Sequence, residues 1–115
     1  MAFTKTETAH IEDAMVAFLA KHRPPETLRA NLDIAYRIKA QSVIIYELRP
    51  IWDDSSEIIE EPVAKATYVR RESRWRIYWQ RSDMKWHYYY PQAEALFFEE
   101  FLVLVEDDAE ACFWG

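Results

Sequence analysis

Residues 62–91 read PVAKATYVRRESRWRIYWQRSDMKWHYYYP, and this stretch decides the fold. It contains three runs that are rich in β-branched and aromatic residues and are separated by two short polar groups. The runs span residues 63–69, 74–80 and 85–90, and the polar groups span 70–73 and 81–84. Runs of this length and composition, joined by short polar turns, are typical of antiparallel strands. The stretch therefore predicts a three-stranded meander.

The first turn of the meander fixes which side chains face each other. A loop of two or four residues about the same centre gives the same pairing of the flanking strands. A turn centred on Arg71-Glu72 sets Tyr68 opposite Trp75 and Ala66 opposite Ile77. Small side chains then alternate with large ones across the strands, as in a packed layer.

The second turn extends the same layer. Centred on Ser82-Asp83, it sets Trp79 opposite Trp86 and Ile77 opposite Tyr88. One face of the meander is therefore predicted to be a wall of aromatic side chains. The opposite face is predicted to be basic and aromatic. We take seven residues of that face as candidate binding residues: Lys65, Arg74, Arg76, Tyr78, Lys85, His87 and Tyr89.

The N-terminal part predicts a helix and then a hairpin. Apolar residues recur at helical spacing from about Thr8, a plausible N-cap, to Arg23, and Pro24-Pro25 stops the pattern. A further short helical turn is expected over residues 25–30. The period then changes to two, which predicts strands at 32–38 and 42–48. The turn around Ala40-Gln41 lacks Asn-Gly, so a longer or less regular loop is an alternative there.

The C-terminal part completes an α+β fold. The acidic residues of 50–61 predict a solvated loop, and Pro91 precedes a helix expected over about Gln92 to Glu106. We expect an antiparallel meander of about five strands, with the N-terminal and C-terminal helices packed on it. The C-terminal helix is expected on the face of Trp75, Ile77, Trp79 and Trp86. The terminal Phe113-Trp114 is expected to dock there or on the first helix rather than fray.

Length and composition exclude several functions. The 115 residues, half of them hydrophobic, suit one domain over 1–115. The only glycine is Gly115, so a Gly-rich phosphate loop or dinucleotide fingerprint is excluded. The lone Cys112 cannot form an intramolecular disulfide, the start lacks a signal-peptide pattern, and no run approaches the roughly 18 apolar residues of a spanning helix. We expect a cytoplasmic protein with no membrane segment and no cofactor.

Charge is distributed unevenly along the chain. The net charge is −6, which argues against bulk attraction to nucleic acid or an anionic membrane. Residues 1–61 carry 7 basic and 11 acidic groups, residues 62–91 carry 7 and 2, and residues 92–115 carry 0 and 7. The predicted meander is thus a basic segment, followed by an acidic one.

Four segments carry a family resemblance. They are Arg49–Trp52, Trp75–Trp79, Trp86–Tyr89 and Cys112–Gly115. In their order and spacing they resemble a small bacterial family, the domain of unknown function 3024, over nearly the whole chain. Members often carry a glycine in the first hairpin turn, where this chain has Ala40-Gln41. The resemblance implies a bacterial origin and supports the fold boundaries, but it implies no activity or catalytic residue.

Few residues of the sequence are candidates for a catalytic or metal-binding role. His87 on the basic face is a candidate general base, although no carboxylate of that face is placed to orient it. Cys112, among Ala111, Phe113 and Trp114, is interpreted as a small buried hydrophobe rather than a nucleophile. The acidic clusters at 53–61 and 106–110 lack calcium-loop spacing, and the histidines lack zinc spacing, so no metal site is expected.

Three hypotheses for function follow. The first is a non-enzymatic interaction module whose basic and aromatic face binds a protein partner or a second copy of the chain. The alternative is a binder of single-stranded nucleic acid or a phosphorylated ligand on the same face. An enzyme centred on His87 is the third. Because non-specific nucleic-acid binders usually carry net positive charge, the first hypothesis ranks above the second.

Overall fold

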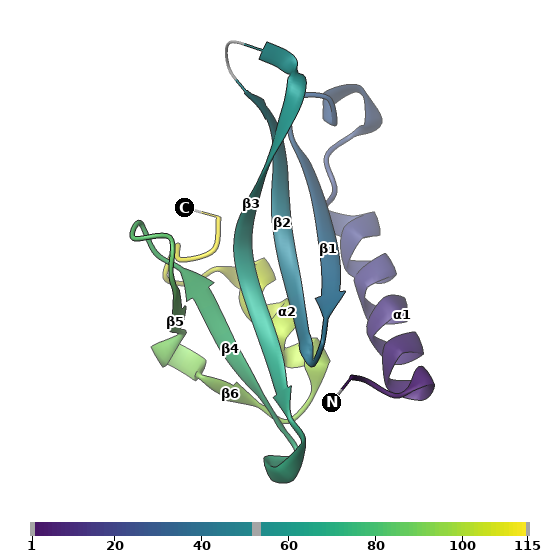
Figure 1. Ribbon diagram of the computed structural model, residues 1–115, viewed down its shortest axis with the longest axis vertical. Coiled ribbons are helices and arrows are strands. Elements are labelled where there is room, and N and C mark those ends of the chain that lie inside the picture. Colours follow the sequence, from purple (N-terminus) through teal and green to yellow (C-terminus); the bar gives the residue numbers. More distant parts are fainter. Residues whose placement is uncertain (1, 52–53, 115) are drawn as a thin grey trace.

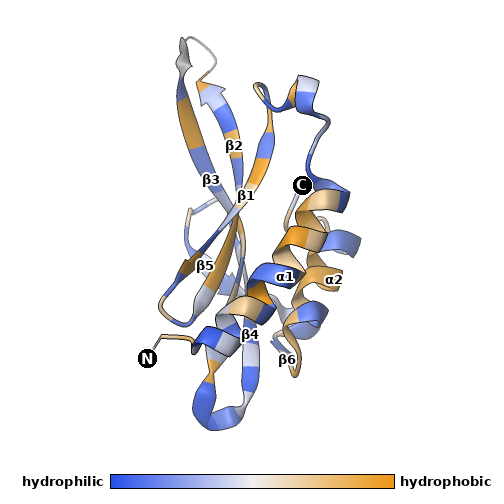
Figure 2. Cartoon of the chain, turned by 90° about the vertical axis from the view of Figure 1, so that its right-hand side faces the viewer, coloured by the Kyte–Doolittle hydropathy of each residue, from blue (hydrophilic) through white to orange (hydrophobic). Residues whose placement is uncertain are grey.

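The computed structural model describes residues 2–51 and 54–114, and it has two layers (Figure 1). One layer is an antiparallel sheet, and the other consists of two α-helices that lie together on one side of it (Figure 2). The α+β class and the placement of both helices on the sheet are as predicted. In the described part of the chain, no helix covers the other side of the sheet.

The strands follow one another across the sheet almost in chain order. The helices are α1 (Lys5–His22) and α2 (Phe98–Asp107), and the strands are β1 (Asp33–Lys39), β2 (Ser42–Ile51), β3 (Asp54–Val69), β4 (Arg74–Gln80), β5 (Trp86–Tyr88) and β6 (Glu94–Ala95). Short 3-10 turns lie at Glu26–Leu28, Arg70–Glu72 and Tyr90–Gln92. The order is β1-β2-β3-β4-β5, and β6 also pairs with β4. The meander and the short turn within 25–30 are confirmed.

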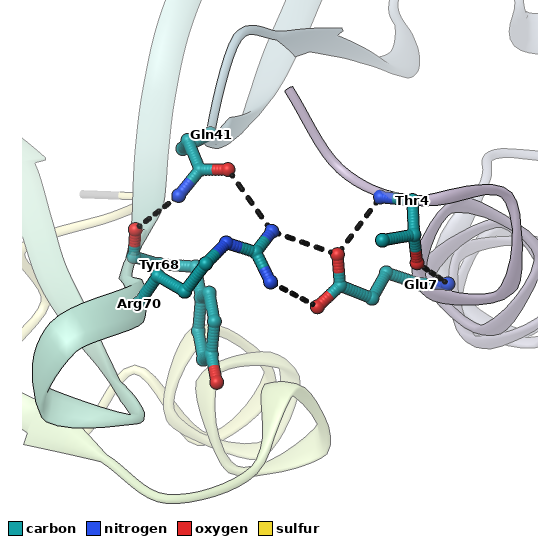
Figure 3. A network of polar contacts seen from close by, with 5 residues as sticks. All are labelled: Thr4, Glu7, Gln41, Tyr68 and Arg70. Carbon is teal, nitrogen blue, oxygen red and sulfur yellow. Dashed lines mark hydrogen bonds and ion pairs between the residues drawn. The ribbon is translucent and has the colours of Figure 1, made fainter. Parts of the chain in front are cut away.

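Helix α1 begins one turn earlier than predicted, with Thr4 rather than Thr8 as N-cap. The Thr4 hydroxyl accepts a hydrogen bond from the Glu7 backbone N–H, and the Glu7 carboxylate accepts one from the Thr4 N–H (Figure 3). This capping box satisfies two backbone donors of the first turn. Glu7 also accepts two hydrogen bonds from Arg70, at 3.0 and 2.9 Å, and Arg70 donates to Gln41. The start of α1 is thereby tied to the end of β3 and the β1–β2 turn.

The first hairpin has a tight turn instead of a longer loop. Lys39 pairs with Ser42, so only Ala40 and Gln41 form the turn. Ala40 has a φ of 53°, in the left-handed region that favours glycine. Alanine thus adopts here a backbone conformation that glycine reaches at lower cost.

Strands β2 and β3 continue through the segment predicted as a loop, and that prediction was wrong. The pairs run from Ser42↔Thr67 to Ile51↔Asp54, with a β-bulge between Ile45 and Tyr46. Beyond the bulge the pair forms a twisted arm that extends past the helices (Figure 1). Ile58 and Ile59 are exposed there. The acidic composition is compatible with strands because both faces of this arm meet solvent.

The register of β3 and β4 is as predicted, with Tyr68↔Trp75 and Ala66↔Ile77. The register of β4 and β5 is shifted by one residue, because Trp79 pairs with His87 instead of Trp86. The cause is an odd loop: the Arg81 N–H donates to the Lys85 carbonyl and encloses three residues.

Met84 closes this three-residue loop. Its N–H donates to the Arg81 carbonyl, and its φ is 62°. A left-handed residue at this place is typical of three-residue hairpin loops. Because side chains alternate along a strand, the one-residue shift inverts β5. Trp86 and Tyr88 turn away from the helices, and Tyr89 turns toward them.

The core lies between the sheet and the two helices. Its buried residues come from α1, the central strands and α2: Ile11, Met15, Phe18, Val43, Ile45, Val63, Ala64, Ala66, Trp75, Ile77, Phe98, Phe101, Leu102 and Val105. Tyr89 and Phe113 also belong to this core. Trp86 does not, which corrects its predicted place in the wall beneath the C-terminal helix. No helix in the described part of the chain is long and apolar enough to cross a membrane.

Helix α2 begins at Phe98, six residues after the predicted start at Gln92. Glu94 and Ala95 pair with Arg76 and Trp75 as β6, so they cannot be helical. Leu96 and Phe97 are consequently exposed instead of facing the core. The Glu100 carboxylate accepts the Leu96 and Phe97 N–H groups and caps the helix.

The C-terminal residues are docked, as predicted. Phe113 is 6% exposed, and its ring centroid lies 4.8 Å from that of Tyr89. The Asp108 carboxylate accepts the Phe113 and Trp114 N–H groups, and the Trp114 indole donates to the Val105 carbonyl at 2.8 Å. The docking site therefore includes Tyr89 and the end of α2, which the prediction did not name.

Candidate interaction surface

The uncovered side of the sheet carries one row of side chains across five strands. Its pairs are Arg37↔Ile44, Ile44↔Lys65, Lys65↔Tyr78 and Tyr78↔Tyr88. The adjacent row, from Val43 through Ala66 to Ile77, is buried under the helices, so this row points the other way. We call this row, with the nearby Tyr46, Arg76 and Trp86, the open face.

Lys65 is the centre of the open face. Its ammonium lies 4.7 Å from the ring centroid of Tyr78 and 4.9 Å from that of Trp86. Both are cation–π distances. Burial lowers the pKa of the Lys65 ammonium below its usual value, because a partly desolvated cation is less stable than a solvated one. The aromatic rings partly offset this loss and hold the lysine in place.

Tyr88 and Tyr90 extend the open face from Tyr78 toward the edge of the sheet. The rings of Tyr78 and Tyr88 stack with centroids 5.0 Å apart, and the Tyr90 ring meets Tyr88 edge-on at 6.5 Å. Burial, followed by the neighbouring Tyr88 hydroxyl, raises the pKa of Tyr78. Tyr88 is 38% exposed and Tyr90 is 83% exposed. The rings therefore form a stacked platform with one side available to a partner.

The arginines of the open face have carboxylate partners. Arg76 pairs with Glu72 at 3.2 Å and also donates to the Tyr88 hydroxyl at 3.4 Å. Arg37 pairs with Glu60 at 2.8 Å, and its guanidinium lies 5.0 Å from the Tyr46 ring centroid. The guanidinium charges are thus largely neutralised within the protein.

Of the seven candidate residues, three lie on the open face as expected: Lys65, Arg76 and Tyr78. Arg74, the first residue of β4, and Lys85, the residue before β5, are exposed. Tyr89 is 1% exposed in the core, which corrects its predicted place and rules out contact with a partner in this fold. Burial is the main cause of the raised pKa of the Tyr89 hydroxyl.

Several residues of this surface were not predicted from the sequence: Arg37, Tyr46, Trp86, Tyr88 and Tyr90. Trp86 and Tyr88 were placed on the wrong side by the even-turn assumption. The available signal was Asp83, whose carboxylate accepts the Lys85 N–H in a local turn. Such a turn favours the irregular three-residue loop, although it does not by itself determine the loop length.

His87 pairs with Trp79, in the row that faces the helices, so its predicted place on the basic face was wrong. Its Nε2 lies 2.8 Å from Oδ2 of Asp83, a carboxylate of the β4–β5 loop and not of that face. The Lys85 N–H and the His87 ring lower the pKa of Asp83. A paired imidazole could move a proton, but catalysis also requires a substrate site beside it. In the described residues, no group of three His, Cys, Asp or Glu could hold a metal ion.

Cys112 has the environment of a structural thiol. Burial, followed by the carboxylates of Asp108 and Glu110, raises the pKa of the thiol, so its nucleophilic thiolate is disfavoured. Its thiol lies 3.7 Å from the Glu110 carbonyl. These surroundings support the interpretation of Cys112 as a small hydrophobe.

The comparison with protein families identifies the chain. The model of the family described as Domain of unknown function (DUF3024) matches residues 3–115. The chain belongs to this family. No curated protein and no solved structure matches it. The matched residues include the open face and both helices. The α+β fold described above is therefore the fold of a DUF3024 member.

Proposed function

We propose that this DUF3024 protein is a non-enzymatic interaction module of the bacterial cytoplasm that binds a protein partner or a second copy through the open face. The observation that carries the proposal is the exposed platform of Tyr88 and Tyr90 beside the Lys65 cluster. Tyrosine, tryptophan and arginine are the residues enriched at protein interface hot spots. The Tyr88 ring is held by stacking on Tyr78, so this side chain loses little freedom on binding.

The charges of the open face favour a protein over a nucleic acid. Arg37 and Arg76 already pair with Glu60 and Glu72, and Lys65 lies between two rings. Binding to phosphates would require these contacts to be exchanged. A protein partner can pack on the rings and leave the ion pairs intact.

Self-association is the first form to test. Sedimentation equilibrium of the wild-type chain is expected to give either 13.8 kDa or about twice that mass. If a dimer forms, Tyr88→Glu and Tyr90→Glu are expected to return it to a folded monomer. The matched control is Val16→Glu, on the exposed side of α1, which should leave the mass unchanged.

If the wild-type chain is a monomer, the partner is sought with the same variants. Chemical cross-linking in a bacterial extract should give one product shared by wild type and Val16→Glu and lost in Tyr88→Glu and Tyr90→Glu. The proposal fails if the two tyrosine variants keep both the mass and every cross-linked product of the wild type.

The nucleic-acid alternative has its own signature. Arg74 and Lys85 are exposed basic residues at the start of β4 and just before β5, and this feature favours the alternative. Affinity for random single strands would fall by roughly 0.7 log units per log salt for each phosphate contacted. Such a slope, lost in Arg74→Ala with Lys85→Ala, would replace the proposed function. Salt-insensitive or undetectable binding would eliminate the alternative.

A further inference from the structure

A pocket lies away from the open face, between the start of α1, the start of α2 and the β3–β4 connection. Its volume is about 340 Å³. The lining residues come from four parts of the chain: Phe3, Thr6, Glu7, His10, Ile11, Tyr68, Trp75, Leu96, Phe97, Phe98 and Glu99. This volume is at the lower end of the range for small-ligand sites. The pocket can therefore hold one ring or one branched alkyl group.

The walls of the pocket are aromatic. The Trp75 ring lies at the centre, with ring centroids of Phe3, Tyr68 and Phe98 at 5.6, 5.1 and 5.0 Å from it. Leu96 and Phe97 complete the lining and are 54% and 66% exposed. Large apolar side chains left exposed beside a concave surface commonly mark a binding site.

The polar groups of the pocket are acidic. Its described lining residues include the carboxylates of Glu7 and Glu99 and no lysine or arginine. Glu7 is fully engaged by Arg70, whose guanidinium also lies 5.6 Å from the Tyr68 ring centroid (Figure 3). Among the described residues, His10 is the one polar partner of Glu99, at 2.9 Å, and the Glu99 side chain is 52% exposed. Glu99 is therefore the carboxylate accessible to a ligand.

We propose that this pocket binds a small organic cation with an apolar body, of the aryl-alkylammonium class. The apolar group lies against Trp75, and the ammonium group reaches Glu99. Aromatic walls favour a cation through their negative ring faces, and a carboxylate at the mouth adds charge complementarity. An anionic ligand would meet two carboxylates with no free cation among the described lining residues.

Three probes of matched size test the class of ligand: 2-phenylethylamine, the neutral 2-phenylethanol and the anionic 3-phenylpropionate. Binding is followed by NMR of ¹⁵N-labelled protein, at the indole N–H of Trp75. We expect the amine to bind with a dissociation constant on the order of 1 mM, about fivefold tighter than the alcohol. The anion is expected to bind more weakly than the alcohol.

Two variants test the roles of charge and volume. Glu99→Gln is expected to abolish the preference for the amine over the alcohol, while the charge-matched control Glu110→Gln keeps it. Thr6→Trp, at an exposed lining position, is expected to fill the pocket and abolish binding, while Thr6→Ala retains it. Spectral dispersion verifies that each variant is folded.

Three results would overturn the proposal. The first is no shift of the Trp75 indole signal with any probe at millimolar concentration. The second is an anion that binds as tightly as the amine. The third is a preference for the amine that survives in Glu99→Gln. None of these outcomes depends on the open face, so they are independent of the proposed function.

Discussion

Replacing Phe113 with alanine is expected to destabilise the protein by about 3–5 kcal/mol. Phe113 is 6% exposed and packs on Tyr89, which is 1% exposed, so the substitution leaves a cavity in the core. Phenylalanine-to-alanine changes in cores cost about 3–5 kcal/mol. A domain has a total stability of roughly 5–15 kcal/mol. A residue two positions before the last residue of the chain therefore accounts for a large part of the stability.

Thermal unfolding followed by circular dichroism measures this loss. For a chain of this length, a loss of 1 kcal/mol lowers the melting temperature by about 4 °C, so a decrease of roughly 12–20 °C is expected. The matched control is Phe97→Ala, because Phe97 is 66% exposed and its removal should cost less than about 0.5 kcal/mol. Trp114→Phe should be intermediate, at about 1 kcal/mol, because it loses the hydrogen bond to Val105 but keeps an aromatic ring.

The melting temperatures of the two alanine variants show whether Phe113 packs in the core in solution. If Phe113→Ala melts at the same temperature as Phe97→Ala, the C-terminal residues contribute nothing to the core in solution. The packing of Phe113 on Tyr89 would then be refuted, and the terminal aromatic residues would be free to contact a partner.

Three further predictions concern the polar and backbone features of the fold. The hydrogen bond from Arg70 is the main cause of the low pKa of Glu7, which falls from 4.5 to about 2. The ion pair therefore stabilises the fold above pH 4.5, and this stabilisation is lost as the pH falls toward 2. The difference in urea midpoint between wild type and Glu7→Gln should therefore shrink over that range. Ala40→Gly should raise the stability by about 1 kcal/mol in urea unfolding, because φ is 53° there; a loss would contradict the left-handed turn. Asp108→Ala should cost about 2 kcal/mol by calorimetry, because it leaves two backbone N–H groups without an acceptor; an unchanged enthalpy and midpoint would contradict this.

The sequence predicted those parts of the fold where local pattern and tertiary packing agree. Tyr68, Trp75 and Ile77 have a clear period of two, and the turn between their strands is of even length, so their register was correct. The β4–β5 register was wrong because it depends on the left-handed backbone of Met84. Methionine gives no signal for that conformation, unlike glycine or asparagine.

Two other errors came from tertiary contacts that a local pattern cannot contain. Leu96 and Phe97 have helical spacing, but Glu94 and Ala95 pair with the edge of β4. The helix therefore begins later in the chain than this spacing predicts. The acidic segment before Pro62 has the composition of a loop, yet it forms a strand because β2 extends beside it. The composition of the open face was predicted in part, since Lys65, Arg76 and Tyr78 lie where expected.

In the three-residue loop between Arg81 and Lys85, the number of residues matters more to the fold than their identity. Surface loops usually accept insertions and deletions. Here, deletion of a single residue would restore the even turn and rotate the following strand by half a turn. Tyr89 would then leave its place beside Phe113, and Tyr88 would leave Tyr78. One deleted codon would thus damage the core and the open face together, whereas many substitutions at Ser82 would affect neither.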